Sequence, residues 1–228
     1  MCPLKTGYNY TDKAVFINGR DITMNRKHLF LTSSGLSDSM KKIFFDVIGK
    51  DPKDLKILYI PTAGIETDEA REGLAVCLDE LAKMGICYEN ILVYNLELLL
   101  SKDYKRTYSQ YIKSPAVITR LLTLEELNRF DAVFVSGGDS AVLCREMART
   151  GFNNVIVKAI NNGLVYVGIS AGSMYVAGNL DDGLHIIPNP VIPHWKENKL
   201  VELPKGEKEI QLVDGQAVYI ENDTIRLI

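Results

Sequence analysis

The stretch from Val165 to Asn179, VYVGISAGSMYVAGN, decides the fold. Its first residues are β-branched and aromatic, which is typical of a buried strand, and residues of fair helix-forming type follow. Between them stands GISAG, residues 168–172, in which glycines flank a serine. GxSxG between a strand and a helix is typical of a nucleophile elbow, a strained turn that exposes the serine at the carboxyl edge of a sheet. We therefore predict that Ser170 is a nucleophile.

The same five residues also fit an ordinary strand-to-helix turn in which Ser170 only caps the helix. The segment before the strand, from Gly151 to Gly163, favours the elbow. Its apolar residues recur at helical spacing and a glycine ends it, so it predicts a helix. A helix, a strand, the elbow and a second helix in succession are the setting that the motif requires.

Working outward, strand-like and helix-like segments alternate along the chain from His28. The expected strands are 28–32, 57–60, 91–94, 131–136 and 165–167, and the expected helices are 36–49, 67–85, a short one from 123, 139–151 and 151–163. This alternation predicts a mostly parallel, doubly wound sheet with helices on both faces. We expect residues 27–228 to form one α/β domain that ends in a hairpin over 217–228. Residues 1–26 are expected to form an N-terminal extension with its own hairpin around Asn18-Gly19.

Composition excludes several classes of function. The 228 residues are 46% hydrophobic and 24% charged with a net charge of -3, which suits a soluble globular protein and predicts neither a nucleic-acid nor a membrane partner. The first residues lack the apolar core of a secretory signal, so we expect a cytoplasmic protein, either a monomer or a homodimer. The four cysteines have no CxxC spacing and the three histidines are dispersed, so we expect reduced, mostly buried thiols, no metal site and no cofactor.

The region from Glu97 to Thr123 is the hardest to interpret. It carries five basic residues against one aspartate, with tyrosines interleaved, a pattern that occurs on nucleic-acid surfaces. A solvated helix or flap is the favoured interpretation because the stretch is short and the whole chain is acidic. A lid over the active site is the remaining alternative.

Two further features supply partners for Ser170. His194 follows a proline at the end of a strand-like segment over 183–195, which makes it the best candidate for a general base among the three histidines. A Gly137-Gly138 turn follows the expected strand 131–136, and Asp139 or Ser140 would cap the next helix. If the two strands are neighbours, the backbone N–H groups of this turn can face Ser170 and form part of an oxyanion hole.

Three motifs occur in order, namely SGGDS at 136–140, GISAGSM at 168–174 and PHW at 193–195. With them the chain resembles, from about His28 to its C-terminus, the peptidase E (aspartyl dipeptidase) family of serine hydrolases. That family is related to cyanophycinase and shares the class I glutamine amidotransferase fold. The resemblance implies a flavodoxin-like three-layer αβα sandwich, in which Ser170 attacks a peptide carbonyl and His194 is the base. It further implies an oxyanion hole at Gly138 and Ala171, and substrate contacts at Gly137 and Asp139.

The chain departs from the family pattern in three places. The interval between Ser170 and His194, where the family's third triad member lies, is short in this chain. Asp182 in that interval is the predicted acid, and Asp181 is the alternative. Asp214, beyond His194, is a less favoured substitute. The family motif after the strand 131–136 is usually GGN, whereas its third position in this chain is Asp139. Aspartyl dipeptidases bind the acidic side chain of the substrate with an arginine downstream of the histidine, whereas lysines stand there in this chain. Specificity for N-terminal aspartate is therefore not expected.

Two hypotheses follow for the function. The first is a serine hydrolase that cleaves a short peptide or a related amide through an acyl-enzyme on Ser170. The second is a catalytically silent relative that binds a small ligand or a protein partner in the same cleft. A fluorophosphonate probe separates them, because an unactivated serine does not react.

Overall fold

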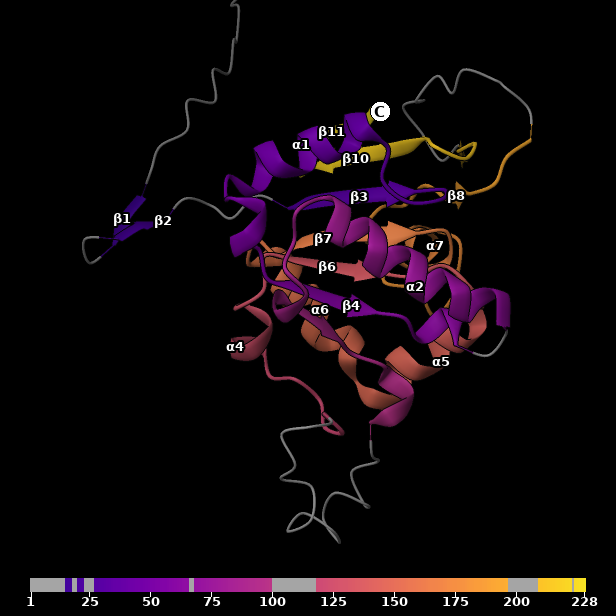
Figure 1. The fold of residues 1–228 in the computed structure, drawn as a ribbon, viewed down its shortest axis with the longest axis horizontal. Helices are drawn as coiled ribbons and strands as arrows, with labels where there is room; N and C mark the ends of the chain where they lie inside the picture. Colours follow the sequence, from indigo (N-terminus) through magenta and orange to yellow (C-terminus); the bar gives the residue numbers. More distant parts are fainter. Residues whose placement is uncertain are drawn as a thin grey trace, which may run out of the picture.

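The computed structural model describes residues 15–17, 20–22, 27–65, 68–99, 118–196, 209–222 and 224–228. Its centre is a seven-stranded sheet with helices on both faces (Figure 1). The strand order is β11-β10-β3-β7-β6-β4-β5; the strands are β3 (His28–Thr32), β4 (Ile57–Ile60), β5 (Ile91–Val93), β6 (Ala132–Val135), β7 (Val165–Ile169), β10 (Ala217–Glu221) and β11 (Thr224–Leu227). The five strands from β3 to β5 in this order are parallel, and the β10–β11 hairpin adds antiparallel to β3. The prediction of a three-layer sandwich with a mostly parallel sheet is confirmed.

Helices of different parts of the chain cover the two faces of the sheet. They are α1 (Asp38–Ile48), α2 (Asp68–Lys83), α4 (Leu124–Leu127), α5 (Ser140–Thr150), α6 (Phe152–Asn161) and α7 (Ala171–Val176), with short 3-10 turns at Pro52–Asp54, Thr62–Gly64, Tyr88–Asn90 and Leu96–Leu98. One core cluster joins α1 and α2 to one face, and another joins α5, α6 and α7 to the other (Figure 1). Alternate residues of each inner strand enter the two clusters, which explains why these strands are almost continuously apolar in sequence.

Local sequence signals account for the helix ends. Ser37 accepts a hydrogen bond from Met40 at the start of α1, and Gly49 ends that helix with a φ of 66°. Thr123 and Glu126 form the reciprocal capping box of α4 that their spacing predicts. These signals were readable without tertiary information.

The predicted strand over 183–195 is wrong for most of its length. Only Val191–Ile192 forms a strand, β8, which pairs in parallel with β9 (Ile210–Gln211). Prolines at positions 188, 190 and 193 remove the backbone donors that a longer ladder needs. The apolar alternation there serves packing, since Ile187 and Val191 are buried.

At the N-terminal side, β1 (Val15–Ile17) and β2 (Arg20–Ile22) pair antiparallel as a separate two-stranded sheet. The expected Asn18-Gly19 turn between them lies outside the described residues, as does most of the region from Glu97 to Thr123. Cys77 and Cys144 are buried, as predicted, and neither they nor Cys87 are in a disulfide; Cys2 lies outside the described residues.

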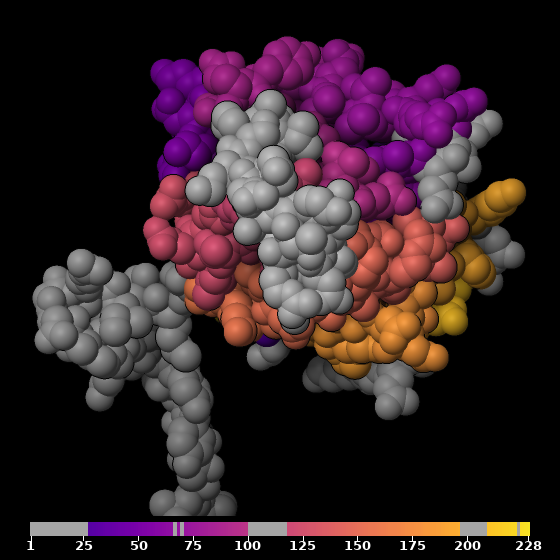
Figure 2. All heavy atoms as spheres, turned by 90° about the horizontal axis from the view of Figure 1, so that it is seen from below, coloured from indigo at the N-terminus to yellow at the C-terminus, as the bar shows by residue number. Residues whose placement is uncertain are grey.

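The segments from 27–99 and 118–196 pack directly against each other in the body of the molecule (Figure 2). Within the described part of the chain, no helix is both long and apolar enough to cross a membrane.

Candidate active site

Ser170 lies at the turn between β7 and α7 with φ 47° and ψ -106°. Such a backbone conformation is strained for a non-glycine residue, costs about 1–3 kcal/mol, and is found mostly at functional sites. A Cβ on Gly168 would stand 2.6 Å from the carbonyl oxygen of Gly172, and a Cβ on Gly172 would overlap the carbonyl oxygen of Val135 on β6. Only glycine fits at either position, so the turn has the geometry of a nucleophile elbow.

The alternative in which Ser170 merely caps the helix is wrong. Its side chain makes no capping hydrogen bond to α7, although the residue occupies the N-cap position. The Ser170 hydroxyl is instead within 3.1 Å of Nε2 of His194. The strain of the turn therefore serves to present the hydroxyl outside the helix.

The neighbouring strands bring two other turns to Ser170. Its backbone N–H donates to the carbonyl of Thr32 at the end of β3, at 3.0 Å. On the other side β6 pairs with β7, which meets the condition set for the Gly137-Gly138 turn, and a Cβ on Gly137 would stand 3.1 Å from the Ser170 Cβ. Because the strands are parallel, their carboxyl ends meet at one edge of the sheet, where open α/β sheets bind ligands.

Gly138 and Ala171 present the backbone donors of this edge. Gly138 has a φ of 128°, and a Cβ there would overlap the carbonyl oxygen of Ala63. Neither the Gly138 N–H nor the Ala171 N–H donates a hydrogen bond to another described residue. Their role as an oxyanion hole stays a prediction, and the free donors are consistent with it.

Asp139 caps α5, which confirms one of the two caps predicted for this helix. One of its carboxylate oxygens accepts hydrogen bonds from the N–H groups of Ala141 and Val142, at 2.7 and 3.1 Å, and so caps α5. The residue is not part of the cavity lining. The substrate contact expected of Asp139 stays a prediction, and its negative charge lies at the N-terminus of α5.

His194 reaches Ser170 from the segment that follows β8. Its backbone has a φ of 57°, and the neighbouring Trp195 N–H donates to the carbonyl of Leu212 at 2.9 Å. The His194 Nε2 lies 3.1 Å from the Ser170 hydroxyl, while its Nδ1 lies 2.7 Å from the carboxylate of Asp214. With the proton on Nδ1 donated to Asp214, Nε2 is free to accept the proton of the serine.

The carboxylate next to His194 belongs to Asp214, which corrects the prediction of Asp182 or Asp181. Both of those residues are exposed in the turn after α7. The negative charge of Asp182 helps to raise the pKa values of Cys144 and Tyr175. The backbone carbonyl of Asp181 lies 3.3 Å from Nε2 of His185. Asp214 reaches the site because the next strand, β10, pairs antiparallel with β3. The third member of the array comes from beyond His194 in the chain, outside the interval in which it was expected.

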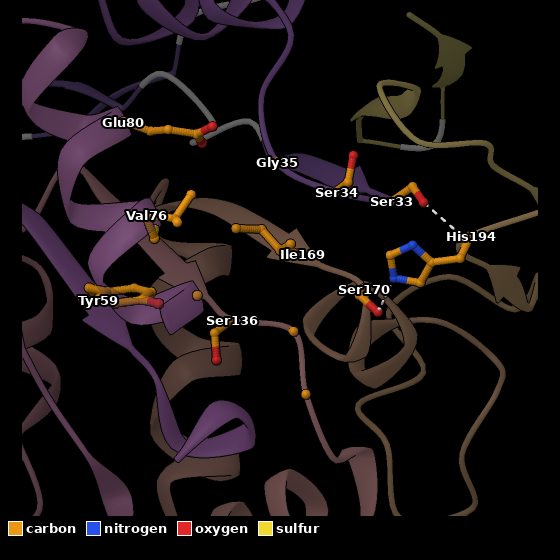
Figure 3. A pocket seen from close by; sticks show the side chains of 14 residues that line it. Ser33, Ser34, Gly35, Tyr59, Val76, Glu80, Ser136, Ile169, Ser170 and His194 are labelled. Atoms are coloured by element: carbon orange, nitrogen blue, oxygen red, sulfur yellow. Dashed lines mark hydrogen bonds between the residues drawn. The ribbon is translucent and has the colours of Figure 1, made fainter. Parts of the chain in front are cut away.

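Ser33 completes the array and was not predicted. Its hydroxyl donates to the Asp214 carboxylate at 2.7 Å. The same hydroxyl accepts from the backbone N–H of His194 at 2.8 Å (Figure 3). Ser33 is fully buried at the end of β3. The only sequence signal for it was its position after a strand of the parallel sheet, at the edge where ligands bind.

The environment of Asp214 favours its ionised form. The hydrogen bond from Ser33, followed by that from His194, lowers the pKa of Asp214 below its usual value near 3.8. In serine triads, a carboxylate at this position orients the imidazole and stabilises the imidazolium that forms during the reaction.

Ser170 and His194 open into a cavity of about 270 Å³ (Figure 3). Its walls are formed by the turns after β3 and β6, the end of β7 and one face of α2. The lining includes Ser33, Gly35, Tyr59, Val76, Glu80 and Gly137. Within the described ranges, no three or more His, Cys, Asp or Glu side chains gather in a way that could hold a metal ion. The chemistry that the site offers is that of its serine, histidine and carboxylate.

Fold and site together define an α/β protein with a serine at a nucleophile elbow and a histidine–aspartate pair within hydrogen-bond reach. The model of "Peptidase family S51" matches residues 113–228, just over half of the chain, and includes Gly137, Ser170, His194 and Asp214. The chain belongs to this family. The expected relation to peptidase E is thereby confirmed.

Individual relatives agree with this assignment. The chain is 34% identical over 97 residues to "Peptidase E" of Streptomyces coelicolor, covering 37% of this chain and 40% of that one. It is 26% identical over 125 residues to "Uncharacterized peptidase PM1590" of Pasteurella multocida, covering 44% of this chain and 60% of the relative. The matches thus span between 40% and 60% of the length of these two curated relatives.

A solved structure supports the fold over almost the whole chain. It is described as a putative peptidase E protein from Listeria monocytogenes EGD-e, and superposes with a TM-score of 0.61 at 20% identity. The likeness covers 89% of this chain and 98% of the other. At this identity the comparison supports the three-layer architecture alone.

Proposed function

We propose that this protein is a serine peptidase that cleaves a short peptide, or a related amide, through an acyl-enzyme on Ser170. The observation that carries the proposal is the continuous array in which Ser170 contacts Nε2 of His194 at 3.1 Å and Nδ1 contacts Asp214 at 2.7 Å. A serine hydroxyl is a weak nucleophile unless a hydrogen-bonded base removes its proton, and this array supplies that base.

In the acylation step, the Ser170 oxygen attacks the carbonyl carbon of the scissile bond while His194 takes the hydroxyl proton. The tetrahedral intermediate then collapses, the C–N bond breaks, and His194 returns the proton to the leaving amine. Water enters, gives its proton to His194 and attacks the acyl-enzyme, which releases the acid and restores the Ser170 hydroxyl. Asp214 keeps the imidazole oriented through both halves of the reaction.

The negative charge of the intermediate is held by the backbone N–H groups of Gly138 and Ala171. Both donors are free of protein acceptors among the described residues; Ala171 directly follows the nucleophile in the chain, and Gly138 lines the same cavity as Ser170. Removing one such donor in other enzymes typically costs about 100- to 1,000-fold in turnover, so two preorganised donors make a large contribution.

A catalytically silent relative that binds a ligand in this cleft is the second candidate. The exposure of the base and the acid favours it, because the side chains of His194 and Asp214 are 54% and 63% exposed. In a Ser-His-Asp triad the aspartate is ordinarily buried, where its charge acts through a lower dielectric.

The intact mass after incubation with a fluorophosphonate probe tests the proposal. We expect one adduct per chain, absent from Ser170→Ala and strongly slowed in His194→Ala. Ser39→Ala on the exposed face of α1 is the matched control and should label like the parent chain. A parent chain that stays unlabelled would contradict the proposal and favour the silent relative.

A further inference from the structure

One face of α2 forms the wall of the cavity opposite the nucleophile. Gly73, Val76, Cys77 and Glu80 line the cavity and recur at the spacing i, i+3, i+4 and i+7 of a single helix face. Val76 is 56% exposed although it is apolar, because it faces this opening and not the core. The face thus presents an apolar surface that ends in one carboxylate.

Glu80 and the catalytic pair stand at opposite ends of the cavity (Figure 3). Val76 and Ile169 lie between them (Figure 3). Tyr59 and Cys77 also line the cavity. Burial raises the pKa of the Cys77 thiol to about 12 and also raises the pKa of the Tyr59 phenol, so both remain uncharged at neutral pH.

The carboxylate of Glu80 forms no salt bridge with a described lysine or arginine, although the Lys83 ammonium is near enough for the two charges to interact. Its Oε2 lies over the Gly35 turn, 3.3 Å from where a Cβ on Gly35 would stand. The nearby Lys83 pairs with Asp79 at 2.5 Å, and no described lysine or arginine forms a salt bridge with Glu80. Among the described residues, His194 is the only basic one in the cavity lining. The half-buried charge of Glu80 therefore favours a cationic group of the ligand.

We infer that the cavity binds a lysine or arginine side chain of the substrate residue next to the cleaved bond. The aliphatic part of that side chain lies over Val76 and Ile169, and its ammonium or guanidinium group meets Glu80. Long basic side chains suit this arrangement because they bury their methylene groups while the charged end stays at a polar rim. An acidic side chain would be repelled, and this agrees with the absence of a basic residue among the described cavity lining.

This inference rests on the proposed peptidase function, so its test must measure peptide binding and not peptide hydrolysis. Calorimetric titration of Ser170→Ala, which still presents the cavity, measures affinity for Lys-Ala, norleucyl-Ala, Asp-Ala and N-acetyl-Lys-Ala. We expect Lys-Ala to bind about 10- to 100-fold more tightly than norleucyl-Ala, the range given by a hydrogen bond to a charged group, and Asp-Ala to bind most weakly.

The Glu80→Gln substitution in the same background keeps the shape and removes the charge. We expect it to abolish the preference for Lys-Ala over norleucyl-Ala while leaving norleucyl-Ala unchanged. Glu72→Gln, on the exposed face of the same helix, is the matched control and should leave the preference intact. Glu80→Lys should shift the preference toward Asp-Ala.

Several outcomes overturn the inference. Equal affinity for Lys-Ala and norleucyl-Ala, tighter binding of Asp-Ala, or no binding of any of the four peptides each does so. If N-acetylation removes the effect of Glu80→Gln, then Glu80 binds the terminal ammonium and the side-chain assignment is wrong. Failure of the peptidase proposal looks different: the parent chain neither hydrolyses these peptides nor takes up the fluorophosphonate, whatever the binding preference of Ser170→Ala.

Discussion

The two halves of the active site are held in place by different means. The elbow around Ser170 is fixed by backbone contacts in the core, where a methyl group on Gly168 or Gly172 would collide with a carbonyl oxygen. The acid–base pair of His194 and Asp214 has side chains more than half exposed and is positioned by a few hydrogen bonds. The stability of the fold should therefore depend on the first half and the rate of reaction on the second.

Asp214→Asn should have the largest effect on activity and little effect on stability. The amide can no longer hold His194 in the tautomer that accepts the serine proton, and the corresponding change in a known triad enzyme costs about 10⁴-fold. We expect a fall of about 10³-fold in kcat at neutral pH, because this aspartate is more exposed, with a free energy of unfolding within about 1 kcal/mol of the parent chain.

The same measurement on Asp182→Asn sharpens this prediction, since Asp182 is the residue that the resemblance favoured. Steady-state hydrolysis and urea unfolding should be recorded for both variants. If Asp182→Asn lowers kcat more than Asp214→Asn does, the array seen in the structure is not the one that operates.

Gly172→Ala should reverse the pattern by damaging the fold. The new methyl group meets the carbonyl oxygen of Val135, so β6 and α7 must separate. We expect a loss of about 3 kcal/mol in the free energy of unfolding, the upper range for an overpacked core, measured by urea denaturation. Gly73→Ala is the control: nothing lies within 4 Å of its new methyl group, and alanine favours the helix by up to about 1 kcal/mol. Equal stability of both variants would mean that the elbow is not rigid.

Ser33→Ala should have an intermediate effect on the acid–base half. Ser33 positions both Asp214 and the backbone of His194, and touches neither reacting atom. We expect kcat to fall about 10-fold, equivalent to one hydrogen bond to a charged group, while KM changes little. The pKa of Asp214 should also rise, because the Ser33 hydrogen bond is the largest cause of its lowering. NMR titration of the Asp214 carboxyl separates this positioning role from simple destabilisation.

The smallest effect concerns stability at acid pH. The folded protein holds the pKa of Asp214 below 3.8, so its contribution is fully present above the unfolded value and is lost as the pH falls through the folded pKa. For an exposed pair we expect less than about 1 kcal/mol. The free energies of unfolding of the parent chain and Asp214→Asn should therefore converge as the pH falls below the unfolded pKa of aspartate, about 3.9. A difference that grows in acid would contradict the assigned direction.

The division between the two halves also explains what the sequence could predict. Local sequence motifs predict the conformation of the turns at Ser170 and at Gly137-Gly138. Pairing of β6 with β7 then places the two turns side by side. Asp214 depends on the antiparallel addition of β10 to β3, which no local pattern encodes. Prolines 188, 190 and 193 outweighed the apolar alternation that suggested a long strand. Glu80 and Ser33 look like ordinary surface and turn residues until the fold places them around one cavity.

The position of β10 in the chain has a consequence for the order of events during synthesis. All parallel strands and Ser170 leave the ribosome before Asp214 and β10 do. A nascent chain that has formed the parallel sheet therefore holds its elbow but has no carboxylate behind His194. In such a chain, docking of the β10–β11 hairpin on β3 is the step that brings Asp214 to His194. The proposed triad is therefore complete only once this edge of the sheet is complete.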